Sequence, residues 1–217
     1  MSQELKKRIF TSIFLLTLLA LMFLNKLVLL FFLIIIYVIS FLEYSNLIKR
    51  IFSRKKYFQF FFNLFYLIYF FIYLSIFYLL NDIFGLKIFI YLCILICVFS
   101  DIGGLIFGKL FKGPKLTKIS PNKTISGSLG SFTFSFLLVI LFSLIFQNII
   151  PLINLIILAG SISLGCQLGD ILFSYLKRKA NLKDTGKILP GHGGILDRID
   201  GMMIGIPFGL LFLLILN

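Results

Sequence analysis

Two aspartates, Asp170 and Asp197, are the side chains of this sequence best suited to chemistry. Asp170 interrupts an apolar stretch, and at helical spacing it shares one face with other polar side chains. These neighbours are Ser163, Gln167, Ser174 and Lys177. Because a polar face is unfavourable against lipid, Asp170 either joins helices through a buried polar contact or binds a ligand. We favour the ligand.

Asp197 opens the last apolar stretch, and glycines follow it at four-residue steps. These are Gly201, Gly205 and Gly209, while the stretch that holds Asp170 has Gly165 and Gly169. Small residues let helix backbones approach closely, which would bring the two carboxylates together. Two carboxylates beside bound phosphates suit Mg²⁺. In the alternative interpretation, Asp197 forms a surface salt bridge with Arg198 or Lys177 and the glycines only pack helices.

The segment between the two aspartates, residues 174–200, is a polar, glycine-rich loop by composition. Its run PGHGG, residues 190–194, cannot continue a helix and exposes backbone N–H groups that suit an anion. We therefore expect substrate contacts at Gly193 and Gly194. His192, the single histidine, is either a phosphate contact or a hydrogen-bonded structural residue.

Charged side chains of the same segment could neutralise a triphosphate or a phospholipid head group. The basic candidates are Lys177, Arg178, Lys183 and Arg198. Alternatively, these residues only set the orientation of the chain in the membrane and attract anionic lipid. We prefer this interpretation for Lys179 and Lys187. Asp184 and Asp200 could orient the basic groups or bind a second cation.

A second polar segment, residues 108–128, contains Ser120, Lys123 and Thr124 just before an apolar stretch. The lysine and the hydroxyls could bind phosphate. The same composition is ordinary for a loop, and both interpretations stay open.

The elements that must position these residues are membrane helices. With 60% hydrophobic and 13% charged residues, the chain is predicted to be an all-α polytopic membrane protein, a bundle of about seven spans with its active site at the cytoplasmic face. The expected spans are residues 9–24, 27–47, 58–80, 83–107, 129–146, 152–173 and 201–216. Residues 1–100 would supply about four spans, and residues 101–217 would form the catalytic region with its signature loop at 174–200.

The distribution of basic residues predicts the orientation. With a cytoplasmic N-terminus, all but two of the 21 Lys and Arg residues fall on the cytoplasmic side, and the exceptions are Lys26 and Lys87. A net positive charge that is confined to short loops between membrane spans is explained by membrane topology, so we expect no nucleic-acid partner. Most acids share the cytoplasmic side, whereas Glu4, Glu43 and Asp82 read as flanking or loop residues. The cysteines, Cys93, Cys97 and Cys166, read as packing residues.

The residues 174–200 resemble, without a gap, the signature of phosphatidate cytidylyltransferases, also called CDP-diglyceride synthases. Two shorter pieces agree with it: Asp101-x-Gly103 followed by Phe107-Gly108-Lys109, and Ser120-Pro121-x-Lys123-Thr124 with Gly127. The sequence departs from the family pattern at Phe173 and at Ser126, where relatives commonly have glutamate.

The resemblance implies transfer of a cytidylyl group from CTP to phosphatidic acid, with Mg²⁺ as cofactor. It assigns the metal centre to Asp170 and Asp197, which with Lys177 and Arg198 are the candidate catalytic residues. The expected partners are CTP, phosphatidic acid and membrane lipids, with a homodimer left open, and the expected location is the cytoplasmic membrane. The rival functions are a CTP-dependent polyprenol or phytol kinase and a membrane transporter.

Overall fold

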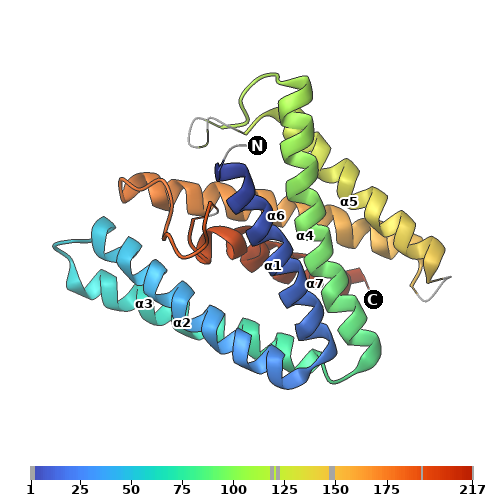
Figure 1. Ribbon diagram of the computed structural model, residues 1–217, viewed down its shortest axis with the longest axis horizontal. Coiled ribbons are helices and arrows are strands. Elements are labelled where there is room, and N and C mark those ends of the chain that lie inside the picture. The colour runs from blue at the N-terminus through green and yellow to red at the C-terminus, as the bar shows by residue number, and fades with distance from the viewer. Residues whose placement is uncertain (1–2, 118–119, 121–122, 147–149, 192, 217) are drawn as a thin grey trace. The chain divides into compact units, whose positions relative to one another are not determined.

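The computed structural model describes residues 3–117, 120, 123–146, 150–191 and 193–216, and these residues form seven α-helices (Figure 1). The helices are α1 (Gln3–Leu24), α2 (Lys26–Ile51), α3 (Lys56–Leu80), α4 (Phe84–Phe111), α5 (Ile125–Ile145), α6 (Leu152–Lys179) and α7 (Leu196–Leu216). Outside the helices, the described ranges contain two isolated β-bridges and no longer strand. The all-α prediction is confirmed.

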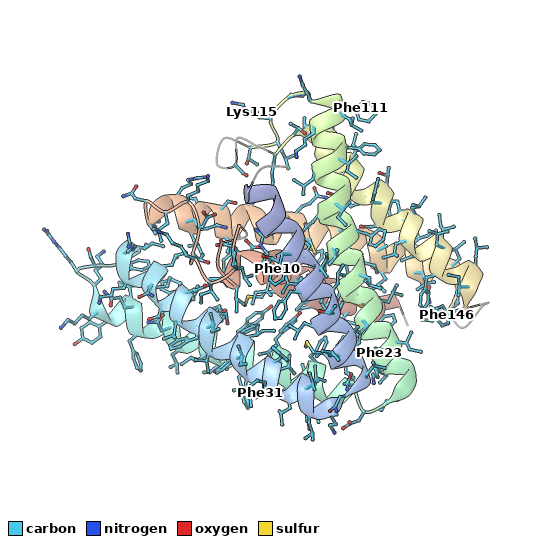
Figure 2. The ribbon with its side chains drawn as sticks, in the orientation of Figure 1. Phe10, Phe23, Phe31, Phe111, Lys115 and Phe146 are labelled. Carbon is cyan, nitrogen blue, oxygen red and sulfur yellow. The ribbon has the colours of Figure 1, made fainter. Side chains whose placement is uncertain are left out.

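Five of the described helices are long and apolar enough to cross a membrane: α2, α3, most of α4, α5 and α6. A shorter apolar segment, Phe10–Leu24, lies within α1. Large apolar side chains project outward from these helices, as Figure 2 shows for Phe31 on α2 and for Phe111 at the end of α4. Such exposure is unfavourable in water and favourable in lipid. The chain is therefore a polytopic membrane protein.

Local signals explain where two helices begin. Asn25 breaks the chain between α1 and α2, and its side chain accepts hydrogen bonds from the N–H groups of Leu27 and Val28. Thr124 caps α5 in the same way by accepting a hydrogen bond from Gly127 N–H. A hydroxyl or amide oxygen at this position satisfies N–H groups that have no partner inside the helix.

The signature loop is shorter than the sequence analysis expected. Its first residues, 174–179, continue α6, and its last residues, 196–200, begin α7. Only residues 180–195 lie between these helices, and we call them the signature loop from here on.

The chain divides into two compact units that do not follow chain order. The first comprises Met1–Lys87 with Leu176–Ile199, and the second comprises Ile88–Tyr175 with Asp200–Asn217. In the first unit, α2 packs along both α3 and α1, and the rings of Tyr44 and Tyr66 stack with their centroids 4.1 Å apart. The signature loop thus belongs to the unit built from the N-terminal helices. The functional division of the chain at residue 100 stays a prediction.

In the second unit, glycines bring helices into close contact. A Cβ atom on Gly165 of α6 would lie 2.8 Å from the Cα of Gly205 on α7, and one on Gly169 would lie 3.1 Å from the Cα of Gly201. These distances are too short for a side chain. The predicted close packing of the last two spans through their glycines is confirmed.

Candidate active site

Asp197 lies in the first turn of α7, ahead of the apolar segment that starts at Gly201, and its side chain is only 4% exposed. Lys177, in the last turn of α6, reaches it with its ammonium group, at 2.7 Å from Asp197 Oδ1. The alternative interpretation, in which Asp197 pairs with Lys177, is therefore confirmed as to the partner. The pair is buried, however, and not on the surface as that interpretation expected.

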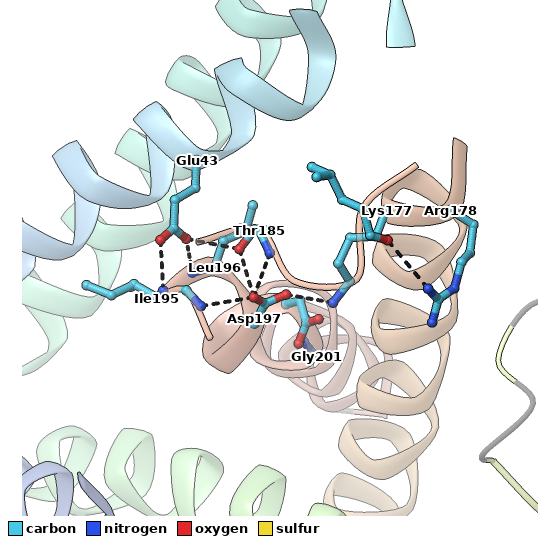
Figure 3. A network of polar contacts seen from close by, with 11 residues as sticks. Glu43, Lys177, Arg178, Thr185, Ile195, Leu196, Asp197 and Gly201 are labelled. Atoms are coloured by element: carbon cyan, nitrogen blue, oxygen red, sulfur yellow. Dashed lines mark hydrogen bonds and ion pairs between the residues drawn. The ribbon is translucent and has the colours of Figure 1, made fainter. Parts of the chain in front are cut away.

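The second oxygen of Asp197 holds the signature loop (Figure 3). Asp197 Oδ2 accepts hydrogen bonds from Thr185 N–H at 2.8 Å, from Thr185 Oγ1 at 3.0 Å and from Gly194 N–H at 3.0 Å. Burial raises the pKa of the Asp197 carboxyl, but the hydrogen bond and charge of Lys177, with the two backbone N–H groups, outweigh burial and leave the pKa below its ordinary value of 3.8. Asp197 is therefore ionised at neutral pH.

Within the loop, the backbones of Leu189 and Gly193 pair with each other. Leu189 N–H donates to Gly193 C=O at 2.9 Å, and Gly193 N–H donates to Leu189 C=O at 3.2 Å. Gly191 and Gly193 have φ values of +75° and +84°, which residues other than glycine rarely adopt. A Cβ at Gly193 would also lie 2.9 Å from Asp197 Oδ2. The backbone requires glycine here for its conformation and for space.

The backbone N–H groups near the start of α7 are engaged by carboxylates of the protein. Gly194 N–H donates to Asp197, while Ile195 and Leu196 N–H donate to Glu43. The anion-binding character that the sequence predicted for this region is therefore present. The described donors bind side chains of the chain itself, and phosphate contacts at Gly193 and Gly194 stay predictions.

Glu43 is the residue that the sequence analysis missed. We expected a flanking residue, but Glu43 is on α2, is 5% exposed, and binds the signature loop and the start of α7. One signal could have found it. An acid inside an apolar helix is costly unless it has a partner, and Glu43 sits inside the stretch that was assigned to the second span.

In the second unit, Asp170 is paired with Lys123. The ammonium of Lys123 lies 2.5 Å from Asp170 Oδ2, and the two side chains are 27% and 24% exposed. Asp170 also faces α7, because a Cβ on Gly201 would lie 2.9 Å from Asp170 Oδ1. Lys123 and Asp170, both predicted site residues, are thus brought together. Asp197 belongs to the other unit, and the shared metal centre stays a prediction.

Described residues of the segment before α5 position Lys123. Lys123 C=O accepts a hydrogen bond from Leu116 N–H, and Lys123 N–H donates to Ser120 C=O. Thr124 caps α5 as described above, and Ser120 N–H donates to Thr117 Oγ1. Ser120 and Thr124 therefore have structural contacts in this loop, and their predicted substrate contacts remain untested.

The other candidates are spread over the first unit and the start of α7. Arg178 is exposed, and its guanidinium donates to Leu182 C=O at 3.5 Å. Lys183, Asp184 and Arg198 are exposed, whereas Asp200 is 8% exposed and its Oδ1 accepts from Gly201 N–H. His192 lies outside the described residues.

The donor chemistry of the two predicted metal ligands fits a cation. Within the described part of the chain, no three His, Cys, Asp or Glu side chains gather as a metal site. Mg²⁺, however, is commonly held by one or two carboxylates together with substrate phosphates. On both Asp170 and Asp197, one oxygen faces a lysine ammonium, which is itself a cation. Carboxylate oxygens that already face a cation are chemically suited to Mg²⁺, and its binding at Asp170 and Asp197 stays a prediction.

Fold and loops together define a helical polytopic membrane protein whose candidate site residues lie in or next to two polar segments. A sequence model described as "Cytidylyltransferase family" matches residues 49–216. This range includes both polar segments and the helices on either side of them. The chain belongs to the cytidylyltransferase family.

Curated relatives agree with this assignment. The chain is 43% identical over 136 residues to the phosphatidate cytidylyltransferase of Bacillus subtilis, a match that covers 62% of this chain and 50% of the relative. It is 41% identical over 137 residues to the enzyme of the same name from Rickettsia bellii, with 58% and 57% covered. For that of Helicobacter pylori the identity is 38% over 137 residues, with 56% and 45% covered. The chain spans about half the length of these relatives.

Proposed function

We propose that this protein transfers the cytidylyl group of CTP to phosphatidic acid and yields CDP-diacylglycerol and pyrophosphate. One observation carries the proposal. The family match runs through the signature loop and through the Lys123 segment, and the curated relatives of the chain carry the name of this activity.

The chemistry requires positioning and charge neutralisation more than acid or base strength. A phosphate oxygen of phosphatidate forms a bond to the α-phosphorus of CTP, and the bond from that phosphorus to the bridging oxygen of the β-phosphate breaks. The leaving pyrophosphate keeps the electron pair. Because the nucleophile is already an anion, no strong base is needed, and the barrier comes from bringing two anionic groups into line.

The described side chains match these requirements. Asp170 holds Lys123 and Asp197 holds Lys177, which fixes two positive charges in partly buried positions. Asp170 and Asp197 would hold Mg²⁺, which when bound neutralises the phosphates of the nucleotide. The two lysines and Arg198 would then bind the attacking phosphate and the pyrophosphate. The lysines would act as point charges, and Arg198 would act as a planar hydrogen-bond donor.

We place the reaction at the cytoplasmic face of the cytoplasmic membrane, with the N-terminus in the cytoplasm. The basic residues of the connecting segments support this orientation through the positive-inside rule. The acyl chains of phosphatidate can stay in the lipid, so only its head group has to reach the polar loops.

The test uses purified protein with phosphatidate, Mg²⁺ and CTP labelled at either the α- or the γ-phosphorus. We expect the α-label in the lipid product and unlabelled lipid with γ-labelled CTP, together with release of pyrophosphate. A γ-label in a lipid alcohol would assign a kinase instead. Movement of lipid or ions across proteoliposomes without consumption of CTP would assign a transporter.

A further inference from the structure

Glu43 is buried among hydrogen-bond donors that come from the other end of the chain. Its Oε2 accepts from Leu196 N–H at 2.8 Å and from Thr185 Oγ1 at 3.1 Å, and its Oε1 accepts from Ile195 N–H at 3.2 Å. Ile195 and Leu196 N–H belong to the start of α7, where N–H groups have no partner inside the helix and the helix dipole favours an anion. Glu43 thus binds α2 to the helix that carries Asp197.

The loop backbone closes around the Glu43 carboxylate. A Cβ atom on Gly194 would lie 2.5 Å from Glu43 Oε2, and a Cβ atom on Gly186 would overlap Glu43 Oε1. The φ values of Gly186 and Gly194 are not in the left-handed region, so these two glycines are required for space. The loop therefore has the shape of a socket for this carboxylate.

Thr185 connects Glu43 to Asp197. Its hydroxyl lies 3.1 Å from Glu43 Oε2 and 3.0 Å from Asp197 Oδ2, as Figure 3 shows. A hydroxyl has a single hydrogen and donates to one acceptor at a time. The two buried carboxylates therefore share one donor, and the position of Glu43 affects how Asp197 is held.

We propose that Glu43 is a positioning residue for the transfer reaction, which acts through Thr185 and the first turn of α7 to fix Asp197 beside Lys177. The proposal deepens the function given above and rests on it. It adds a residue from outside the range 49–216 that the family model matches. Glu43 itself is too buried to contact a substrate, so its effect on the reaction is indirect.

The experiment compares Glu43→Gln with Asp82→Asn, which removes a surface acid of the same unit. Asp82 pairs with Lys26 on the surface and has no described contact with the signature loop. Hydrogen exchange measured by mass spectrometry reports the amides of residues 185 and 194–196. We expect faster exchange at these amides in Glu43→Gln, because its side-chain NH₂ meets N–H donors, and wild-type exchange in Asp82→Asn.

Kinetics of the folded fraction separate positioning from stability. For Glu43→Gln we expect kcat to fall at least about tenfold with KM for CTP changed less than about threefold, as misplacement of a catalytic group predicts. Asp82→Asn should keep both values. A purely structural Glu43 would reduce the amount of folded protein and leave kcat per folded molecule unchanged, and this result would overturn the proposal.

Thr185 provides a second test that does not depend on the stability of the Glu43 variant. Thr185→Val removes the shared hydroxyl at nearly constant volume, whereas Thr185→Ser keeps it. We expect loss of kcat in the valine variant and recovery in the serine variant. Equal activity of both variants, or unchanged exchange in Glu43→Gln, would contradict the proposal. If the wild-type protein transferred no nucleotide yet the exchange changed as expected, the proposed function would fail and the positioning of the loop by Glu43 would stand.

Discussion

At the scale of single residues, the two oxygens of Asp197 have different tasks. Oδ2 binds three donors of the signature loop, whereas Oδ1 accepts a hydrogen bond from the ammonium of Lys177. One oxygen therefore holds the backbone and the other faces a cation. A substitution that keeps an oxygen for the loop and removes the charge separates the two tasks.

Asp197→Asn makes this separation. An asparagine can accept the loop N–H groups through its one oxygen, but its NH₂ group then faces Lys177 and cannot bind a cation. We expect nucleotide transfer to fall at least about a hundredfold, the usual effect of removing one preorganised electrostatic group, in a protein that still inserts and folds. The measurement is formation of labelled CDP-diacylglycerol, with size-exclusion chromatography as the check of folding.

Lys179→Ala is the matched control for that variant. Lys179 lies next to the catalytic candidates in sequence, and its ammonium lies 5.7 Å from the ring centre of Phe52. An exposed cation over an aromatic ring contributes little, about 0.5–1 kcal/mol. We expect nearly full activity. A loss comparable to that of Asp197→Asn would show that Lys179 takes part in the reaction.

The lowered pKa of Asp197 predicts how the loop responds to pH. A carboxyl whose pKa is lower in the folded state contributes stability above its unfolded pKa of 3.8, and this contribution is lost as the pH falls through the folded value. Exchange of the Thr185 and Gly194 amides, corrected for its intrinsic pH dependence, should therefore stay constant from pH 8 to pH 5. A marked increase within this window would mean that Asp197 is protonated at a higher pH than its contacts allow.

At the scale of elements, the N-terminal helices acquire a task that the sequence left open. Thr11 on α1 donates to Pro190 C=O at 2.9 Å, and Glu43 on α2 holds the other end of the same loop. Thr11 and Glu43 precede the range 49–216 that the family model matches, yet their side chains bind the signature loop.

The sequence predicted the helices well because each one is encoded locally. Apolar runs of sufficient length, a cap at Asn25 and four-residue glycine steps are all visible within one segment. The contacts of Glu43 are different in kind, since they join residues 142 to 153 positions apart and no local pattern reports them. For the same reason, the sequence proposed Lys177 as one of two partners for Asp197 but did not connect Lys123 to Asp170.

The glycine contact between α6 and α7 can be tested with Gly205→Val. A Cβ at this position would lie 3.0 Å from Ile162 C=O and 3.1 Å from Cys166 N, which are backbone atoms that cannot move cheaply. Overpacking of this kind costs about 1–3 kcal/mol, so thermal unfolding in detergent should occur at a lower temperature.

Gly85→Ala is the control, because nothing lies within 4 Å of a Cβ on this helical glycine. Alanine is favoured over glycine in a helix by up to about 1 kcal/mol, so the control should be as stable as the wild type or more so. Equal stability of the valine and alanine variants would show that α6 and α7 do not need close contact.

At the scale of the whole molecule, the orientation in the membrane follows from the basic segments and can be read by labelling. The native cysteines, Cys93, Cys97 and Cys166, are free and buried, so they should give little background. Exposed positions on opposite expected sides are Ser53 and Lys187 for the cytoplasm and Asp82 for the outside.

We expect an impermeant maleimide to modify Ser53→Cys and Lys187→Cys only from the cytoplasmic side, and Asp82→Cys only from the opposite side. Inverted and right-side-out vesicles provide the two directions of access. Modification of Lys187→Cys and Asp82→Cys from the same side would mean that the number of spans between them is not the one proposed here.

The contacts of Glu43 also constrain how the chain is synthesised. The ribosome delivers α2 to the membrane early, whereas the amides of Ile195 and Leu196 emerge about 150 residues later. Until then, a carboxylate on an apolar helix lacks the backbone donors that offset its desolvation. In a nascent chain that stops before α7, the Glu43 carboxylate therefore lacks these two backbone donors on an otherwise apolar helix. A membrane protease could use this feature to distinguish incomplete copies from finished ones.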